Sequence, residues 1–334
     1  MPDPWLDEEP EVFSLRIAVS AATAPQDTLQ LAIDVICPRP DQIPTHPIVY
    51  FGYPGGGYNR HYFDLSLRHL DARAPYSQAR FHATRGEIFV ACDHVGVGGS
   101  DVPTAPLGYQ DVARMNVLAA REVTSRLTDG SLIPGLGPVD PGAIVGIGQS
   151  FGGFLLTLAQ AGDPVFDGVA FLGWSAIQTD PGWPPGVDVA SILRDGARGD
   201  DPNNPRRRAY HWADVPLEIL NADLTRAPGS AGADERWGAR HHPGGPLLVA
   251  ERNPVAPGVV AQEAAAISTP VLIVAGKTDV MHDPWAEPSA YRSSSDVTLC
   301  VFPHMAHMHN FSSNRFRLWQ RLSDWARTVA ATRR

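Results

Sequence analysis

The chain has 334 residues, with 43% hydrophobic and 19% charged side chains and a formal net charge of −9. This hydrophobic content is enough for a sizeable core and excludes a disordered chain. Acidic residues outnumber basic ones by 36 to 27, and the one basic run that stands out is 206–208, so no nucleic-acid partner is expected. The 31 glycines and 31 prolines predict a globular protein rich in turns.

The N-terminal segment and the cysteines bear on the compartment. Met1–Val12 is acidic and carries three prolines, which is not the pattern of a secretory signal. No apolar run approaches the roughly 18 residues that a membrane helix needs. Cys37, Cys92 and Cys300 are far apart and each lies in or ends an apolar run, which predicts buried thiols and no disulfide framework. We therefore expect a soluble cytoplasmic protein that binds a small molecule and no membrane; a homo-oligomer stays open.

Short apolar runs alternate with longer stretches along most of the chain. The first two runs have no long segment between them, so we expect them to pair antiparallel at one edge. The alternation predicts an α/β fold with an eight-stranded, mostly parallel sheet flanked by helices. The eight predicted strands are Phe13–Val19, Leu29–Ile36, Ile48–Tyr53, Glu87–Cys92, Ala143–Ile147, Gly168–Trp174, Val271–Ala275 and Val297–Phe302.

Helical patterns occupy the later gaps between these runs. The predicted helices are Phe63–Ala72, Tyr109–Leu127, Phe151–Ala161, Asp283–Tyr291 and Asn310–Ala330.

The alternation stops at residues 176–261, which are rich in glycine and proline but also carry aromatic residues. Helices are predicted there at Pro216–Leu224 and Pro257–Ala266. The aromatic content favours an ordered cap over a disordered linker. We therefore expect one domain, 1–334, with a core of 1–175 and 262–334 and a cap inserted after the sixth strand.

A candidate nucleophile lies between a predicted strand and a predicted helix. Gly148–Gly153 contains the pattern G-x-S-x-G, with Ser150 at its centre. Small flanking residues allow the tight turn that exposes a serine hydroxyl, and the helix behind it presents free N–H groups to a developing anion. The alternative interpretation is a glycine-rich turn in an ordinary α/β fold.

A second motif, Asp93–Ser100, has the pattern D-x-x-G-x-G-x-S after the fourth predicted strand. Together with the G-x-S-x-G turn, it resembles the α/β-hydrolase fold family, and the resemblance covers nearly the whole chain. The resemblance implies an eight-stranded sheet with a cap after the sixth strand. It also implies that an acid and a base follow the serine in the chain, in that order.

The resemblance places the base on the loop after the last strand and the acid after the seventh. A serine hydroxyl needs such a base, usually a histidine held by a carboxylate. The base is then His307, with His304 and His309 as rivals, and the acid is Asp279 in a G-x-x-D pattern. Asp279 could alternatively stabilise its turn, and Asp283 is expected to cap the next helix.

Two other interpretations of these motifs concern ligands. His304, His307 and His309, with His282, could bind zinc, but no H-E-x-x-H pattern or cysteine ligand accompanies them, so no metal is expected. The glycine run at 55–57 could cradle a phosphate, but no lysine lies near it, as a P-loop would require.

The glycine run after the third predicted strand is expected to form an oxyanion hole. Three successive glycines, Gly55, Gly56 and Gly57, allow backbone N–H groups to converge on a carbonyl oxygen. In esterases and lipases of the family that this chain resembles, the loop often reads H-G-G-G. Here Pro54 takes the place of the histidine, which leaves the main-chain donors intact and the anchoring of the loop open. We expect the N–H of Phe151 and one from the glycines to form the hole.

The predicted function is cleavage of a carboxylic ester or lactone of a largely apolar small molecule, through an acyl-enzyme and without a cofactor. Thioesterase, amidase, carbon–carbon bond hydrolase and acyltransferase reactions could use the same residues, and a non-catalytic receptor on this scaffold is the alternative of another class. Epoxide hydrolysis and dehalogenation are disfavoured, because family members with those activities carry aspartate at the nucleophile position. The aromatic residues expected to contact substrate are Tyr53, Tyr58, Trp174, Trp183, Tyr210 and Trp212.

Overall fold

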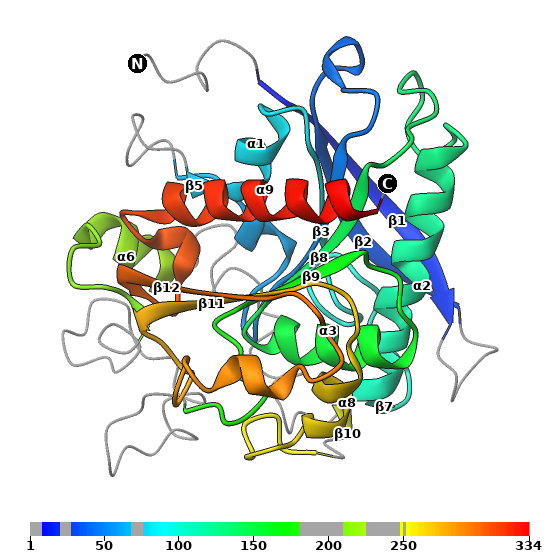
Figure 1. The fold of residues 1–334 in the computed structure, drawn as a ribbon. Helices are drawn as coiled ribbons and strands as arrows, with labels where there is room; N and C mark the ends of the chain where they lie inside the picture. Colours follow the sequence, from blue (N-terminus) through cyan, green and yellow to red (C-terminus); the bar gives the residue numbers. More distant parts are fainter. Residues whose placement is uncertain are drawn as a thin grey trace.

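The computed structural model describes residues 9–20, 28–67, 76–180, 210–224, 248–249 and 252–333. Eight strands form one sheet in the order β1-β2-β6-β3-β8-β9-β11-β12 (Figure 1). The β1–β2 and β2–β6 pairs are antiparallel, and the other neighbours are parallel. The strands are β1 Glu11–Ser20, β2 Thr28–Cys37, β3 Ile48–Tyr53, β6 Ile88–Cys92, β8 Ala143–Gln149, β9 Gly168–Leu172, β11 Val271–Thr278 and β12 Val297–Ala306.

The sheet is the one predicted, including its antiparallel edge. Its inner strands β3, β6, β8, β9 and β11 are buried on both faces, as continuous apolar runs require, because helices cover both faces (Figure 1). The edge strand β12 is mostly half-buried. On one face lie α2 Tyr109–Thr128, α3 Phe151–Gly162 and α8 Ala261–Ala266; on the other lie α1 Gln78–Ala83 and α9 Arg315–Thr332. The chain therefore has the α/β-hydrolase fold.

Three helix predictions need correction. In the described part of Phe63–Ala72, Phe63 ends the short 3-10 helix η2 Arg60–Phe63, and β4 Asp64–Leu65 follows, paired with β5 Tyr76–Ser77. Residues 68–72 of this prediction lie outside the described residues. Phe63, Leu65 and Leu67 are buried at every second position, which is the periodicity of extended chain and not of a helix. No helix was predicted at Gln78–Ala83, where the structure has α1.

The other two corrections lie near the C-terminus. At Asp283–Tyr291 the structure has turns and the 3-10 helix η3 Glu287–Ala290, because Pro288 would lie inside the predicted helix, where it has no N–H to donate and its ring clashes with the preceding turn. Asp283 accepts a hydrogen bond from Trp285 N (3.0 Å), so it stabilises this turn. At Asn310–Ala330, the helix α9 begins only at Arg315, after η4 His309–Phe311.

The described parts of the inserted segment lie between β9 and β11. They include α6 Leu217–Leu224 and β10 Leu248–Val249, which pairs with β7 Leu107–Gly108. Figure 1 shows α6 beside the ends of β11 and β12. Trp183 and the basic run 206–208 lie outside the described residues.

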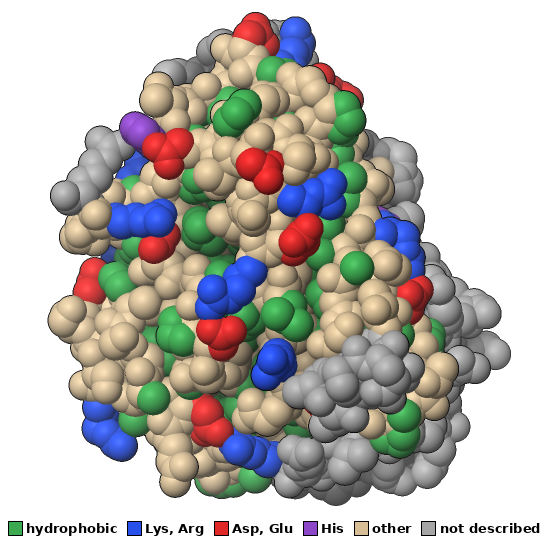
Figure 2. Space-filling view, turned by 90° about the vertical axis from the view of Figure 1, so that its right-hand side faces the viewer, with side chains coloured by type: hydrophobic (Ala, Val, Ile, Leu, Met, Phe, Trp, Pro, Cys, Tyr) green, Lys and Arg blue, Asp and Glu red, His purple; other side chains and the backbone are tan. Residues whose placement is uncertain are grey.

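The cysteines are free thiols: Cys37 and Cys92 are buried, and Cys300 is half-buried instead of buried as predicted. Burial raises the pKa of Cys37 to about 12. Acidic and basic side chains are interspersed among the described residues on the face that Figure 2 shows. Among the described helices, none is both long and apolar enough to cross a membrane.

Candidate active site

Ser150 lies in the turn between β8 and α3, in a strained backbone conformation. Its φ is 50° and its ψ is −119°, a combination that non-glycine residues rarely adopt and that is found at functional sites. Ser150 N donates a hydrogen bond to Leu172 O at the end of β9 (2.9 Å), and Ser150 O accepts from Gly153 N (2.8 Å). The turn is thus held by the neighbouring strand and by the first turn of α3, which is the geometry of a nucleophile elbow.

The glycines of the motif are needed because other chain segments pass within contact of them. A Cβ at Gly148 would lie 2.6 Å from Gly153 Cα, and one at Gly153 would lie 2.5 Å from Trp174 Cβ. A Cβ at Gly152 would overlap the carbonyl oxygen of Tyr53, at the end of β3. The glycine pattern thus lets β3, β8 and α3 meet closely at one point.

Asp279 and His307 follow two neighbouring strands, β11 and β12, at the same edge of the sheet as Ser150. His307 Nδ1 lies 2.8 Å from Asp279 Oδ1, and both side chains are buried. Gly173, the residue after Leu172, packs against this pair, since a Cβ there would lie 2.7 Å from His307 Nδ1. His307 and Asp279 therefore lie beside the strand end to which Ser150 N is hydrogen-bonded.

His309, a rival for the role of base, contacts the same carboxylate. Its Nε2 lies 2.9 Å from Asp279 Oδ2, and it has no exposed surface. Burial by itself raises the pKa of Asp279, but the imidazoles of His309 and His307 outweigh burial and hold that pKa well below its usual range. The carboxylate is therefore ionised at neutral pH, as required of a group that orients a catalytic imidazole.

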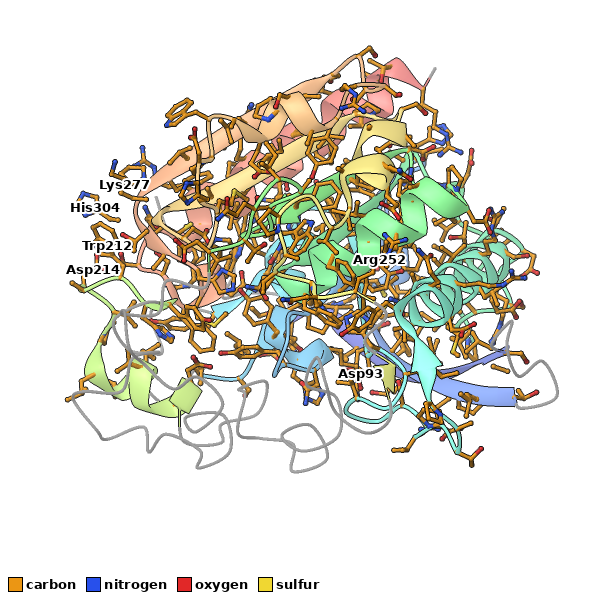
Figure 3. All side chains as sticks on the ribbon, turned by 90° about the horizontal axis from the view of Figure 1, so that it is seen from below. Asp93, Trp212, Asp214, Arg252, Lys277 and His304 are labelled. Carbon is orange, nitrogen blue, oxygen red and sulfur yellow. The ribbon has the colours of Figure 1, made fainter. Side chains whose placement is uncertain are left out.

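The histidines considered as zinc ligands do not converge on one point. His304 is exposed and its ring lies 5.5 Å from that of Trp212, at the edge of the molecule (Figure 3). His282 is also exposed. His307 and His309 direct nitrogens at Asp279, not at a common point. In the described part of the chain, no group of three or more His, Cys, Asp or Glu side chains is arranged to hold a metal ion.

The glycine loop after β3 lies over the elbow. A Cβ at Gly55 would lie 3.0 Å from Ser150 Cβ and would overlap the side-chain oxygen of Gln149. A Cβ at Gly56 would lie 3.7 Å from Phe151 Cβ, and Gly57 has a positive φ of 89°. Gly55 and Gly56 thus lie closest to Ser150 and Phe151, where an oxyanion hole would be.

His94 supplies the anchor that the glycine loop lacks in its own sequence. Its Nε2 lies 3.0 Å from Pro54 O, and its Nδ1 lies 3.1 Å from the side-chain nitrogen of Asn116 on α2. An Nε2–H tautomer satisfies both contacts, because it donates to the carbonyl and accepts from the amide. No role for His94 was predicted from the sequence, although it lies within the D-x-x-G-x-G-x-S motif. Its position after β6, the strand beside β3, is the signal that could have assigned one.

The same turn fixes the far end of the loop. The buried Asp93 carboxylate accepts hydrogen bonds from Arg60 N (2.6 Å), Arg60 Nη1 (2.6 Å) and Gly99 N (2.8 Å). Arg60 Nε also donates to Asp34 on β2 (2.7 Å). The loop 54–60 is therefore tied down at both ends by residues 93–99, which gives the D-x-x-G-x-G-x-S motif a structural role. Asp93 is labelled in Figure 3.

Gln149, to which the sequence analysis assigned no role, lies between the glycine loop and His307. Its Nε2 lies 3.4 Å from both Nε2 and the backbone oxygen of His307, and it is fully buried. The amide therefore faces the imidazole nitrogen that Asp279 does not bind. With Gly173, this is the second contact that places His307 beside the elbow.

The aromatic residues expected to contact substrate lie in different surroundings. Tyr53 and Trp174 are buried, and their rings pack on Phe166 and Phe154. Tyr210, which is half-buried, has its ring 5.0 Å from that of His307. Trp212 lies farther out beside His304, as described above. Of the described aromatic residues, Tyr210 is thus placed next to the candidate base.

Tyr58 connects the glycine loop to the inserted segment. Its hydroxyl donates to Asp223 Oδ1 of α6 (2.8 Å) and also lies 2.9 Å from Met308 Sδ, next to His307. His211 Nε2 lies 2.9 Å from the other oxygen of Asp223. All of these side chains are buried, so the segment 210–224 is packed against both the glycine loop and the His307 loop.

Comparisons with known proteins agree with this architecture. Residues 50–318 match the family model described as the alpha/beta hydrolase family. A comparison with curated protein sequences gives no match.

Several solved structures share the fold. A thermophilic esterase from Thermogutta terrifontis has a TM-score of 0.59 at 16% identity, over 95% of this chain and 99% of its own. The proline iminopeptidase of Mycobacterium smegmatis has a TM-score of 0.59 at 17% identity, over 96% and 100%. A haloalkane dehalogenase loop variant from Bradyrhizobium elkanii has a TM-score of 0.58 at 14% identity, over 96% and 98%. The names of these proteins indicate different reactions, so the likeness identifies the fold and not the substrate. Because the family model matches well over half of its length, the chain belongs to the alpha/beta hydrolase family.

Proposed function

We propose that the protein is a serine hydrolase that cleaves a carboxylic ester or lactone of a largely apolar small molecule through an acyl-enzyme. The observation that carries the proposal is the buried Asp279–His307 pair, with 2.8 Å between its facing atoms, beside the strained elbow at Ser150. A serine in a glycine turn, a histidine with one ring nitrogen that the carboxylate does not bind, and an ionised carboxylate are the groups that acyl transfer needs.

The reaction follows from the role of each group. Asp279 fixes the His307 tautomer that has its proton on Nδ1, so Nε2 is the nitrogen that accepts the Ser150 proton as the hydroxyl attacks the acyl carbon. The N–H of Phe151 and one from Gly55, Gly56 or Gly57 stabilise the tetrahedral anion. His307 then returns its proton to the leaving group and activates the water that releases the acid.

The class of substrate is inferred from the surroundings of His307. The Tyr210 ring beside His307 supports an apolar acyl or alcohol group. Thioesters, amides, activated carbon–carbon bonds and acyl transfer to a second substrate use the same groups. Serine at position 150, in place of aspartate, argues against dehalogenation, although one structural neighbour is named a dehalogenase.

The test is labelling by a serine-directed fluorophosphonate, read by intact mass. Wild type should gain one adduct at near-neutral pH, and Ser150→Ala should gain none. Ser289→Ala, at an exposed serine hydrogen-bonded to Ala286 O, is the matched control and should label like wild type. A wild type without an adduct would contradict the proposal and favour a non-catalytic receptor. With labelling established, a panel of esters, lactones, thioesters and amides identifies the bond.

A further inference from the structure

Asp279 accepts four hydrogen bonds, two at each oxygen. Oδ1 accepts from Val280 N (2.8 Å) and faces His307 Nδ1 (2.8 Å). Oδ2 accepts from Gly276 N (2.7 Å) and faces His309 Nε2 (2.9 Å). A carboxylate offers about four lone-pair positions, so this one is saturated, and two of its four donors are imidazoles.

The second imidazole has only one arrangement of its proton that fits its surroundings. His309 is completely buried, and its Nδ1 has no hydrogen-bond partner among the described residues. A proton on Nδ1 would be a buried donor without an acceptor, which is unfavourable. His309 is therefore neutral with its proton on Nε2, the reverse of the tautomer that the Asp279 contact assigns to His307.

His309 is not suited to be the base itself. Its Nε2 is committed to Asp279, and its Nδ1 has no exposed surface through which a substrate could reach it. His307 binds the carboxylate through Nδ1 and keeps Nε2 toward Gln149 and the elbow. The two histidines therefore have different roles, although they are only two positions apart and their rings lie 6.2 Å apart.

We propose that His309 is a positioning residue that tunes the base: it holds Asp279 in place and takes up part of its negative charge. This inference rests on the proposed function. A carboxylate whose charge is shared with a second donor stabilises protonated His307 less. The wild-type enzyme should therefore keep His307 free of its proton, and Ser150 reactive, to lower pH than an enzyme without His309.

Other titratable groups lie around the loop that carries His307 and His309. They are Tyr62 of η2, whose hydroxyl lies 3.5 Å from Asn310 N, Tyr58 of the glycine loop, Tyr210 beside His307, and the Asp223–His211 pair of the inserted segment. Among the described residues, none of these groups forms a hydrogen bond with Asp279. Substitutions at His309 leave all of them in place, so a difference from wild type reports on His309.

The first measurement is the rate of Ser150 phosphonylation by the fluorophosphonate as a function of pH, which needs no knowledge of the substrate. In His309→Phe, which keeps a ring but removes the donor, the midpoint of the acidic limb should rise by about 0.5–1 pH unit. The maximal rate should fall about 10-fold, within the range that acid–base groups contribute.

Two matched variants separate tuning from simple packing. In His309→Gln the amide nitrogen lies the same number of bonds from the backbone as Nε2, so the midpoint should return to within about 0.3 unit of wild type. His82→Gln changes another fully buried histidine, whose Nδ1 lies 2.7 Å from Glu87 Oε2 between α1 and β6. It should lower stability and leave the midpoint unchanged.

A second measurement is independent of catalysis. Long-range proton–nitrogen spectra of protein labelled with ¹⁵N-histidine should show His307 protonated on Nδ1 and His309 protonated on Nε2 at neutral pH, with assignments from His307→Gln and His309→Gln. A His309 proton on Nδ1 would overturn the inference.

The outcomes also separate this inference from the proposed function. If wild type labels and His309→Phe has the wild-type midpoint, the role of His309 is refuted and the serine hydrolase stands. If His309→Gln abolishes labelling while His307→Gln retains it, the two histidines are assigned the wrong way round. If wild type does not label at all, the proposed function fails, and the role of His309 in it fails as well.

Discussion

Gly173→Ala tests whether the position of His307 is set by backbone packing after β9. Gly173 has a φ of +60°, and a Cβ there would lie 2.7 Å from His307 Nδ1 and 2.9 Å from Asp279 Oδ1. The alanine would press directly on the hydrogen bond between His307 and Asp279, which orients the proposed base.

The expected size of the effect follows from these distances. An ordinary contact between a Cβ and a ring nitrogen needs about 3.4 Å, so the imidazole must move by about 0.7 Å or lose its bond to Asp279. Displacement of a catalytic group by about 1 Å costs roughly 100-fold in rate, so Ser150 phosphonylation should slow by about 10- to 100-fold. The positive φ adds roughly 1–2 kcal/mol of strain to the folded state.

Gly137→Ala is the matched control for that strain. Gly137 also has a positive φ, 75°, but a Cβ there would meet nothing within 4 Å. Gly137→Ala should lose roughly 1–2 kcal/mol in urea unfolding, and Gly173→Ala at least as much. Only Gly173→Ala should also lose labelling rate, measured at a temperature where both variants are folded. Equal labelling rates in the two variants would refute the idea that Gly173 sets the position of His307.

Two further predictions concern stability. Burial raises the pKa of Asp34, but hydrogen bonds, led by that from His61, outweigh burial and lower the pKa to about 2. In the unfolded chain the pKa of an aspartate is about 3.9. The ionised carboxylate therefore stabilises the fold above pH 4, and about 2 kcal/mol of that stabilisation is lost as the pH falls to 2. Asp34→Asn should therefore flatten the dependence of the unfolding free energy on pH between 5 and 2, and a slope equal to that of wild type would contradict the assignment. Tyr58→Phe removes a donor from the buried Asp223 carboxylate and should lower the free energy of unfolding by about 1–3 kcal/mol in urea. An unchanged urea midpoint would show that this contact does not hold α6.

The sequence predicted most of the sheet because strand formation there depends on local composition. Continuous apolar runs such as Gly168–Leu172 must be covered on both faces, and their spacing leaves room for the helices that cover them. Predictions failed where local composition was ambiguous. Around Phe63, Leu65 and Leu67 the apolar content suggested a helix, but these residues alternate as in extended chain, and Leu65 pairs with the strand at Tyr76–Ser77. At Asp283–Tyr291 the apolar content suggested a helix, and the interior proline Pro288 prevented it.

The sequence by itself determined which residues follow the strands: Ser150 in its glycine turn, Asp279 after β11 and His307 after β12. Only the tertiary structure decided how these residues are paired and supported. His307 and His309 are chemically identical and lie two positions apart, and the roles proposed for them differ only because they direct different nitrogens at Asp279. Likewise, the anchor of the glycine loop is His94, from 40 positions farther along the chain. Parallel strands bring distant loops to one edge of a sheet, and hydrogen bonds across that edge are set by the packing of the strands and not by local sequence.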